Sequence, residues 1–250
     1  MMMNKYKVNF YNDNIEFFVT DSYIKLVKLF ETLKIKKGKI IHVLGAPGTG
    51  KSTNIFHAID ETNLKVYNVK LNLKTGNESS KEVFNKMIQD LGSDLGVNSK
   101  DEIYKKLSSF DSILIADSFH DAHLLNSNVV GFSQWTNKAG LGSFYFYLLC
   151  IIEYLKKRKY FKNINLIFQT SWRFNFRDKR YDIFTDFGLL SKILAKVLKI
   201  FFVVIEIAYS EEETIEIVKI YIKDARVEDI KHYIKKFGFK PRLICQALEK

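Results

Sequence analysis

Proline, cysteine and long apolar runs are scarce in this sequence. Only two prolines and two cysteines occur among its 250 residues. Cys150 and Cys245 lie far apart and have no metal-binding spacing, which indicates buried thiols in a reducing compartment rather than a disulfide framework. The longest apolar runs, FYFYLLCII and IFFVVIEIA, fall well short of the ~20 residues that a membrane-spanning helix requires. We therefore expect a cytoplasmic protein with no membrane partner.

Basic residues exceed acidic ones by a wide margin. The sequence has 39 Lys and Arg against 28 Asp and Glu, which gives a formal net charge of +11 and a pI near 9.4. This balance suits a polyanionic partner such as nucleic acid. It is also compatible with a lysine-rich surface whose side chains are simply solvated. Charge alone leaves both interpretations open.

Helical and extended patterns alternate along the chain. Apolar residues at helical spacing predict a helix over 22–34, and the short apolar stretch 40–44 predicts a buried strand. Ser99 and Glu102 form the capping-box signature of another helix. Further strands are predicted at 65–73, 112–117, 164–169, 200–208 and 214–222, and further helices from 51, from 79, and at 143–158, 227–237 and 241–249.

This alternation predicts an α/β fold with three layers, in which a mainly parallel sheet is covered by helices on both faces. The segment YSEEE separates the last two predicted strands and is interpreted as the turn of a C-terminal antiparallel hairpin. Residues 1–35 are expected to form a hairpin and helix segment, 36–226 the α/β core, and 227–250 a short helical tail.

One stretch matches a phosphate-binding pattern in full. Residues 45–52 read GAPGTGKS, which fits G-x-x-x-x-G-K-[ST] between a predicted strand and a predicted helix. Its glycines permit backbone angles that turn several N–H groups into one concavity, and the helix N-terminus adds a favourable dipole. The lysine supplies a charge for the β- and γ-phosphates, and the serine a hydroxyl for Mg²⁺. The predicted nucleotide-binding residues are Gly45, Ala46, Pro47, Gly48, Thr49, Gly50, Lys51, Ser52 and Thr53.

A second candidate for the site is Asp117, which follows the aliphatic stretch SILIA. A carboxylate at the end of such a strand holds Mg²⁺ in many P-loop proteins. Many P-loop ATPases place Glu directly after this Asp to polarise the attacking water, whereas this chain has Ser118. Either the base stands elsewhere or the chain turns nucleotide over slowly. No guanine-reading N/TKxD motif is evident, which favours ATP over GTP.

The order of these pieces resembles the RecA superfamily, in particular its compact archaeal RadB and KaiC-like members. In that group the carboxylate strand ends in Asp-Ser, and the next strand ends in a polar cluster containing Gln; here INLIFQTSW supplies Gln169. FGLLSKILAKVLKIFFVVIEI is similar to the helix and strand that follow, and IVKIYIKDAR to a hairpin strand ending in a basic pair. The resemblance covers about residues 20–226. It implies a RecA-like ATP-binding core.

The resemblance also implies roles for individual residues. The catalytic carboxylate of the family stands just after the second strand, where Glu78 is the nearest candidate; Glu82 falls on a predicted helix. No Glu stands directly at the strand end, so weak or partner-dependent hydrolysis is an open alternative. Gln169 would lie near the γ-phosphate. Lys223 and Arg226 would reach a neighbouring subunit's phosphate, which implies head-to-tail self-assembly; a solvated basic strand end is the other interpretation.

The stretch SWRFNFRDKR, residues 171–180, interleaves aromatic and basic side chains. Aromatic rings stack on bases while Arg and Lys contact phosphates, the usual chemistry of single-strand binding. In RecA-like recombinases the loop at this place binds DNA, and a second loop corresponds here to 126–142. Packing of the rings against the core, or a protein-docking surface, are the alternatives. The candidate nucleic-acid residues are Trp172, Arg173, Phe174, Arg177 and Arg180.

Together these features predict an ATP-binding protein that uses Mg²⁺ and couples nucleotide state to single-stranded DNA or to a protein partner, with recombination or repair as the implied role. One alternative is a KaiC-like regulatory protein with little hydrolysis. Another is an AAA+ ATPase, since FGFKPRLICQALEK is similar to the end of a helical lid with Arg242 as its sensor. The predicted C-terminal hairpin and the few residues left after Arg226 argue against AAA+ at this level.

Overall fold

The computed structural model describes residues 17–69, 79–115, 142–170, 173–176, 179–182, 184 and 187–249. Most of the hairpin predicted over 5–19 lies outside these ranges. The chain divides into an α/β unit, Ser22–Ala208, and a second unit formed by Met1–Asp21 with Tyr209–Lys250. The two units are considered separately.

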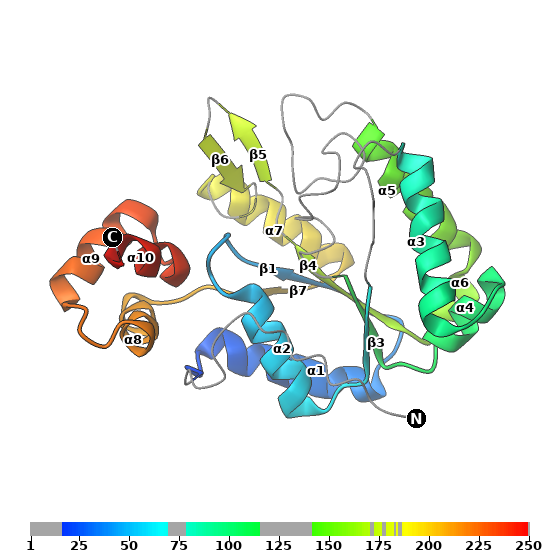
Figure 1. Ribbon diagram of the computed structural model, residues 1–250, viewed down its shortest axis with the longest axis horizontal. Helices are drawn as coiled ribbons and strands as arrows, with labels where there is room; N and C mark the ends of the chain where they lie inside the picture. The colour runs from blue at the N-terminus through cyan, green and yellow to red at the C-terminus, as the bar shows by residue number, and fades with distance from the viewer. Residues whose placement is uncertain are drawn as a thin grey trace. The chain divides into compact units, whose positions relative to one another are not determined.

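A five-stranded parallel sheet forms the centre of the α/β unit (Figure 1). Its strands stand in the order β2-β3-β4-β1-β7, and every neighbouring pair is parallel. The central strand β4 lies between β1 and β3, with Ile41 opposite Ile167 and Leu114 opposite the same residue from the other side. The bounds are β1 Ile40–Leu44, β2 Val66–Asn68, β3 Ser112–Ile115, β4 Asn165–Thr170 and β7 Val203–Glu206. The predicted parallel α/β sheet is confirmed.

Helices of the α/β unit begin where the sequence places its capping signals. Ser79 with Glu82 and Ser99 with Glu102 both form complete capping boxes, each joining a serine side chain to a backbone N–H and a glutamate to the serine N–H. The predicted helices at 22–34, from 51, from 79 and from 99 are confirmed. The bounds are α1 Asp21–Ile35, α2 Lys51–Thr62, α3 Ser80–Leu95, α4 Lys100–Leu107, α5 Gly142–Lys156, α6 Arg158–Phe161 and α7 Leu189–Phe201.

The core of the α/β unit is built from apolar side chains that the helices turn toward the sheet. Helices α3, α4 and α5 pack on one another and enclose Val83, Ile103 and Phe146, all at most 3% exposed. Helix α1 contributes Leu26 and Phe30, which are completely buried. The Tyr23 hydroxyl donates a hydrogen bond to Glu61 and so joins α1 to α2, which lie side by side in Figure 1.

Strand β4 is followed by a two-stranded antiparallel sheet. Its strands are β5 Arg173–Phe176 and β6 Lys179–Asp182, with Phe174 opposite Tyr181 and Asn175 opposite Arg180. This hairpin is therefore formed by the basic aromatic stretch rather than by the C-terminal segment for which a hairpin was predicted.

Residues 209–249 of the second unit form three helices, and this corrects the predicted hairpin. Residues 214–222, predicted as a strand, lie mostly within α8, Glu211–Tyr221. YSEEE is the start of this helix: Glu213 N–H donates to Ser210 Oγ at 3.1 Å, and Ser210 N–H to Glu213 Oε2 at 2.8 Å. The capping box outweighs the strand preference of the β-branched residues that follow.

Helices α9 Val227–Phe237 and α10 Pro241–Leu248 complete the unit and confirm the two predicted terminal helices. They pack with α8 around a small apolar centre. Its fully or nearly fully buried members are Ile215, Val218, Ile230, Ile234 and Ile244.

Both cysteines are free thiols that are partly buried. Burial raises the pKa of Cys150 to about 12 and that of Cys245 to about 11, so neither is a nucleophile at neutral pH. In the part of the chain that the structure describes, no helix combines the length and apolar character needed to cross a bilayer.

His42 is a partly buried titratable group on β1, the strand that leads into the glycine-rich loop. Its ring stacks on Phe168 with centroids 5.2 Å apart and contacts Phe202, while Nδ1 lies 2.9 Å from Thr170 Oγ1. Burial lowers the pKa of His42 to about 4. The imidazole is therefore neutral at physiological pH, where it acts as a packing group.

We predict that stability falls at mildly acidic pH because of His42. Protonation favours the unfolded chain, whose histidine pKa is near 6.5, so the contribution is complete above that pH and is lost as pH falls toward 4. Between pH 7.5 and pH 5 the protein should lose about 2 kcal/mol more unfolding free energy than His42→Phe. Urea denaturation at both pH values measures this. Equal losses in the two proteins would contradict it.

Candidate functional site

The glycine-rich loop joins the end of β1 to the start of α2, as its sequence predicts. Gly48 has φ 92°, and Gly50, the N-cap of α2, has φ 71° and ψ 27°. These left-handed angles are costly for residues with a Cβ, which explains the glycines at both positions. Asn54 donates both its backbone N–H and its side-chain amide to the Gly50 carbonyl at 2.9 Å, which fixes the first turn of the helix.

Lys51 is only 4% exposed and its ammonium lies against the backbone of the loop. Nζ donates to the Gly45 carbonyl at 2.7 Å and lies 3.5 Å from the Ala46 carbonyl. Thr49 braces the same turn, since its hydroxyl donates to the Ala46 carbonyl at 2.8 Å and its N–H at 3.2 Å. A lysine ammonium at a glycine-rich loop and a helix N-terminus makes the surroundings electropositive, the arrangement that binds phosphate groups in proteins.

Gly45 occupies a place that no larger residue fits. A Cβ at this position would lie 2.9 Å from Thr49 Oγ1, 3.0 Å from the Ile207 carbonyl oxygen and 3.1 Å from Lys51 Cγ. The loop is therefore packed tightly against both Ile207, the residue after β7, and the lysine stem. The missing side chain therefore lets the loop pack closely against Thr49, Ile207 and the Lys51 stem.

Gln169 links the next strand to this loop. Its side chain is 1% exposed, and its Nε2 donates to Ser52 Oγ at 2.8 Å. The position follows from register, because Gln169 stands opposite Val43, two residues before the loop. The phosphate-binding pattern assigns Ser52 to Mg²⁺, and the family resemblance implies that Gln169 lies near the γ-phosphate; the structure brings their side chains together. Their roles toward a nucleotide stay predictions.

Several predicted site residues lie outside the described ranges. These are the Mg²⁺ candidate Asp117, the base candidate Glu78, and Trp172 and Arg177 of the basic aromatic stretch. Glu82, the alternative base, is committed to the capping box of α3. Arg173 and Phe174 lie on β5 and Arg180 on β6.

The predicted trans fingers do not stand at a strand end. Lys223 and Arg226 lie in the connection between α8 and α9, within the three-helix unit. Arg226 is the N-cap of α9, and its guanidinium pairs with Asp229 through contacts of 2.8 and 3.2 Å. The pair is exposed, so it stabilises the start of α9 only modestly. The hairpin position from which their role was inferred is thus absent. Arg242, the sensor candidate of the AAA+ alternative, is exposed near the start of α10.

Sequence reasoning missed two residues beside the loop. Asn54 holds the first turn of α2, and Thr170 meets His42 behind the loop. Thr170 follows Gln169 directly in the polar cluster at the end of β4, which was a usable signal; Asn54 has no motif of its own. Within the described ranges no cluster of three His, Cys, Asp or Glu could hold a metal ion, so the Mg²⁺ candidates remain Ser52 and Asp117.

No protein-family profile matches the sequence, and no curated protein is significantly similar. Two solved structures with similar folds are the replication initiator DnaA bound to AMPPCP and single-stranded DNA (TM-score 0.43, 14% identity) and AMPPCP-bound DnaA from Aquifex aeolicus (TM-score 0.41, 15% identity). Each match covers 96% of this chain and 65% of the DnaA chain, so the protein spans less than two thirds of their length. The likeness is distant. The features of this chain itself define an α/β protein of P-loop type: a parallel sheet, a glycine-rich loop and a helix N-terminus with a buried lysine.

Gly45→Ala is expected to disrupt the loop. The added methyl cannot fit without displacing the β7 backbone or the Lys51 stem, so nucleotide affinity should fall at least about tenfold. Gly96→Ala is the matched control: its φ is also positive, at 65°, but a Cβ there meets nothing within 4 Å. The control should lose about 1 kcal/mol of stability and no affinity. Calorimetric titration with a non-hydrolysable ATP analogue measures the affinity of both variants. Unchanged affinity in Gly45→Ala would contradict the close packing of the loop around Gly45.

Proposed function

We propose that this protein binds Mg-ATP at residues 45–53 and hydrolyses it slowly or in response to a partner. The observation that carries the proposal is Lys51, whose ammonium is buried at the N-terminus of α2 and held by the loop's own carbonyls. Burying an ammonium is costly, and hydrogen bonding to backbone oxygens of the loop offsets part of that cost. Phosphate oxygens are better partners for it than neutral carbonyls.

Each residue of the loop has a part in this proposal. The backbone N–H groups of Gly48, Gly50, Lys51 and Ser52 cradle the phosphates, and Lys51 exchanges the Gly45 carbonyl for a β- or γ-phosphate oxygen. The Ser52 hydroxyl and Asp117 would hold Mg²⁺, which neutralises charge on the phosphates. Gln169 donates a hydrogen bond to Ser52, so a nucleotide bound in the loop would affect the end of β4 through this contact.

The chemistry of hydrolysis needs a base, and Glu78 is our candidate for it. Because Glu78 does not stand at the end of the second strand, the orientation of water would depend on a partner that completes the site. We therefore propose slow turnover by the isolated protein. The second candidate function is a regulatory ATP-binding protein with little hydrolysis, which is favoured by the same late position of Glu78.

The partner we propose is single-stranded DNA at the β5–β6 hairpin. This hairpin follows Gln169 within a few residues, so the end of β4 connects it directly to the phosphate site. Its sequence interleaves Arg173 and Arg180 with aromatic residues, which suits phosphate contacts and base stacking. Docking of a protein at the same hairpin is the competing interpretation.

The second unit bears on the class of ATPase. The RecA resemblance drew on a C-terminal hairpin, and that segment is helix α8 instead. Three helices with an apolar centre of their own now follow the α/β unit, which answers both objections to the AAA+ alternative. We therefore favour an AAA+-type ATPase over a RecA-like one. The recombination or repair role depended on the RecA resemblance and is not carried further.

Lys51→Ala should lose nucleotide binding. Removing one charge-assisted contact to phosphate costs about 1.5–3 kcal/mol, which is a fall in ATP affinity of about tenfold to a hundredfold. Lys25→Ala removes an exposed lysine from α1 and is the matched control, with no expected change. Calorimetric titration with Mg-ATP measures the affinity, and retention of affinity by Lys51→Ala would overturn the site assignment.

Single-stranded DNA should stimulate ATP turnover. The stimulation should be lost in Arg173→Ala/Arg177→Ala, because the hairpin then lacks two phosphate contacts, while basal ATP affinity stays unchanged. Lys196→Ala/Lys199→Ala removes the same charge from α7 and should behave as wild type. Steady-state phosphate release with and without oligonucleotide measures this. Tight ATP binding with no turnover under any condition would favour the regulatory alternative instead.

A further inference from the structure

Basic side chains gather at the edge of the sheet opposite the glycine-rich loop. In a parallel sheet all strands begin at one edge, so residues that precede different strands become neighbours there. Lys36 and Lys39 precede β1, Lys65 precedes β2 and Lys162 precedes β4. The short helix α6, just before β4, adds Arg158 and Lys159. We call these six side chains the amino-edge patch. All six are exposed.

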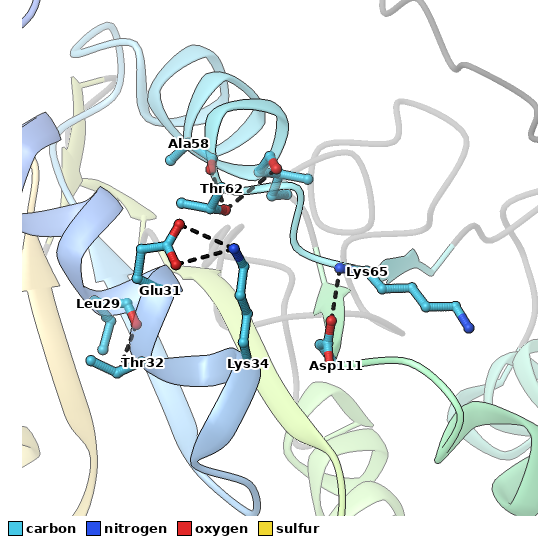
Figure 2. A network of polar contacts seen from close by, with 9 residues as sticks. Leu29, Glu31, Thr32, Lys34, Ala58, Thr62, Lys65 and Asp111 are labelled. Carbon is cyan, nitrogen blue, oxygen red and sulfur yellow. Dashed lines mark hydrogen bonds and ion pairs between the residues drawn. The ribbon is translucent and has the colours of Figure 1, made fainter.

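Backbone contacts hold the members of this patch together. The Leu166 N–H donates to the Lys39 carbonyl at 2.8 Å, and a Cβ on Gly38 would lie 2.8 Å from the Lys162 carbonyl oxygen. The Asp111 carboxylate, which precedes β3, accepts the Lys65 N–H at 3.0 Å. Figure 2 shows this contact, with the Lys65 side chain directed away from Asp111. The patch therefore extends from β1 across β4 and β3 to β2, three strand spacings or about 14 Å.

The acidic side chains in this region are already paired with other lysines. Lys37 Nζ lies 2.5 Å from Asp111 Oδ1, and Lys157 Nζ lies 2.7 Å from Asp101 Oδ1. Lys34 pairs with Glu31 at 3.1 Å, on the last turn of α1 (Figure 2). Among the described residues none of the six patch side chains forms an ion pair. Nearby helix C-termini contribute only about half a negative charge each, so the patch keeps a large positive excess.

The patch offers charges rather than stacking surfaces. Two rings lie beside the patch, Phe110 and Tyr160, and the ammonium groups of Lys65 and Lys159 stand over them at 5.2 and 4.8 Å from their centroids. Ile35 at the end of α1 and Phe201 before β7 are exposed apolar side chains near the starts of β1 and β7. A single-strand site uses several stacking rings, and membrane anchoring uses a continuous apolar face. A row of cations without either suits the phosphate backbone of a duplex.

We propose that the amino-edge patch binds double-stranded nucleic acid through its phosphate backbone, independently of base sequence. This surface is separate from the glycine-rich loop and from the β5–β6 hairpin, and the proposal does not rest on ATP binding or on single-strand binding. Binding here should depend steeply on salt, because each lysine that meets a phosphate releases a counterion.

The test compares two triple variants of the full chain. Lys36→Gln/Lys39→Gln/Lys162→Gln removes three patch charges, and Lys25→Gln/Lys28→Gln/Lys81→Gln removes three exposed lysines from α1 and α3 as the matched control. Fluorescence anisotropy with a 25-base-pair duplex is measured over a salt series. We expect the patch variant to bind at least about tenfold more weakly, with a log–log salt slope shallower by about 2–3. The control should match wild type.

Further measurements distinguish a specific loss of duplex binding from misfolding and from a general effect of net charge. Thermal melting verifies the fold of both variants, and Mg-ATP and single-stranded DNA affinities should be unchanged in the patch variant. Equal weakening in both variants would mean that net charge alone attracts DNA and would overturn the proposal. Unchanged duplex binding in the patch variant would overturn it too, as would a matching loss of binding to vesicles of anionic lipid or to single strands. Failure of ATP binding in wild type would leave this proposal standing.

Discussion

All five strands of the sheet run in the same direction, and the chemistry of the molecule follows from that constraint. Every strand ends at one edge of the sheet, so the glycine-rich loop after β1 and Gln169 at the end of β4 meet there. Every strand begins at the other edge, so Lys39, Lys65 and Lys162 meet although they are far apart in the chain. In an antiparallel sheet, strand starts and strand ends alternate along each edge, so the residues after the strands would not be separated from those before them.

The glycine-rich loop holds a charged side chain, the Lys51 ammonium, inside a packed fold. Lys51 loses its hydration on burial, and its hydrogen bond to the Gly45 carbonyl replaces only part of it. That carbonyl is available because Gly45 lets the loop fold back onto the lysine stem, where a Cβ would touch Thr49 and the β7 backbone. Backbone geometry and buried charge are therefore coupled, because a side chain at position 45 would displace the carbonyl to which the ammonium donates.

Local signals in the sequence predicted local structure, and tertiary context decided the rest. Ser79 and Ser99 each have a glutamate three residues later, the capping-box pattern that predicts a helix, and both helices form. Ser210 and Glu213 give the same signal, yet the β-branched residues after them favoured a strand and the predicted hairpin was wrong. The place of Gln169 was predictable because it falls at a predicted strand end, where the family resemblance puts a polar cluster containing Gln. The amino-edge patch was not, since Lys36 and Lys162 become neighbours only through the placement of β4 beside β1.

Strand β4 runs from one of these edges to the other. Its hydrogen bonds therefore bear on whether a ligand at one edge can affect binding at the other. At its start the completely buried Asn165 accepts the Lys39 N–H and donates to the carbonyls of Leu33 and Asp111, which ties α1, β1 and β3 to one side chain. At its end Gln169 bonds Ser52. The structure gives β4 one arrangement, in which it is anchored at both ends and paired with a strand on each side. Coupling between sites requires an element with two states that both ligands bias. Duplex bound at the amino edge should therefore leave ATP affinity unaltered, and regulation by a partner must act through the connections that leave the carboxyl edge.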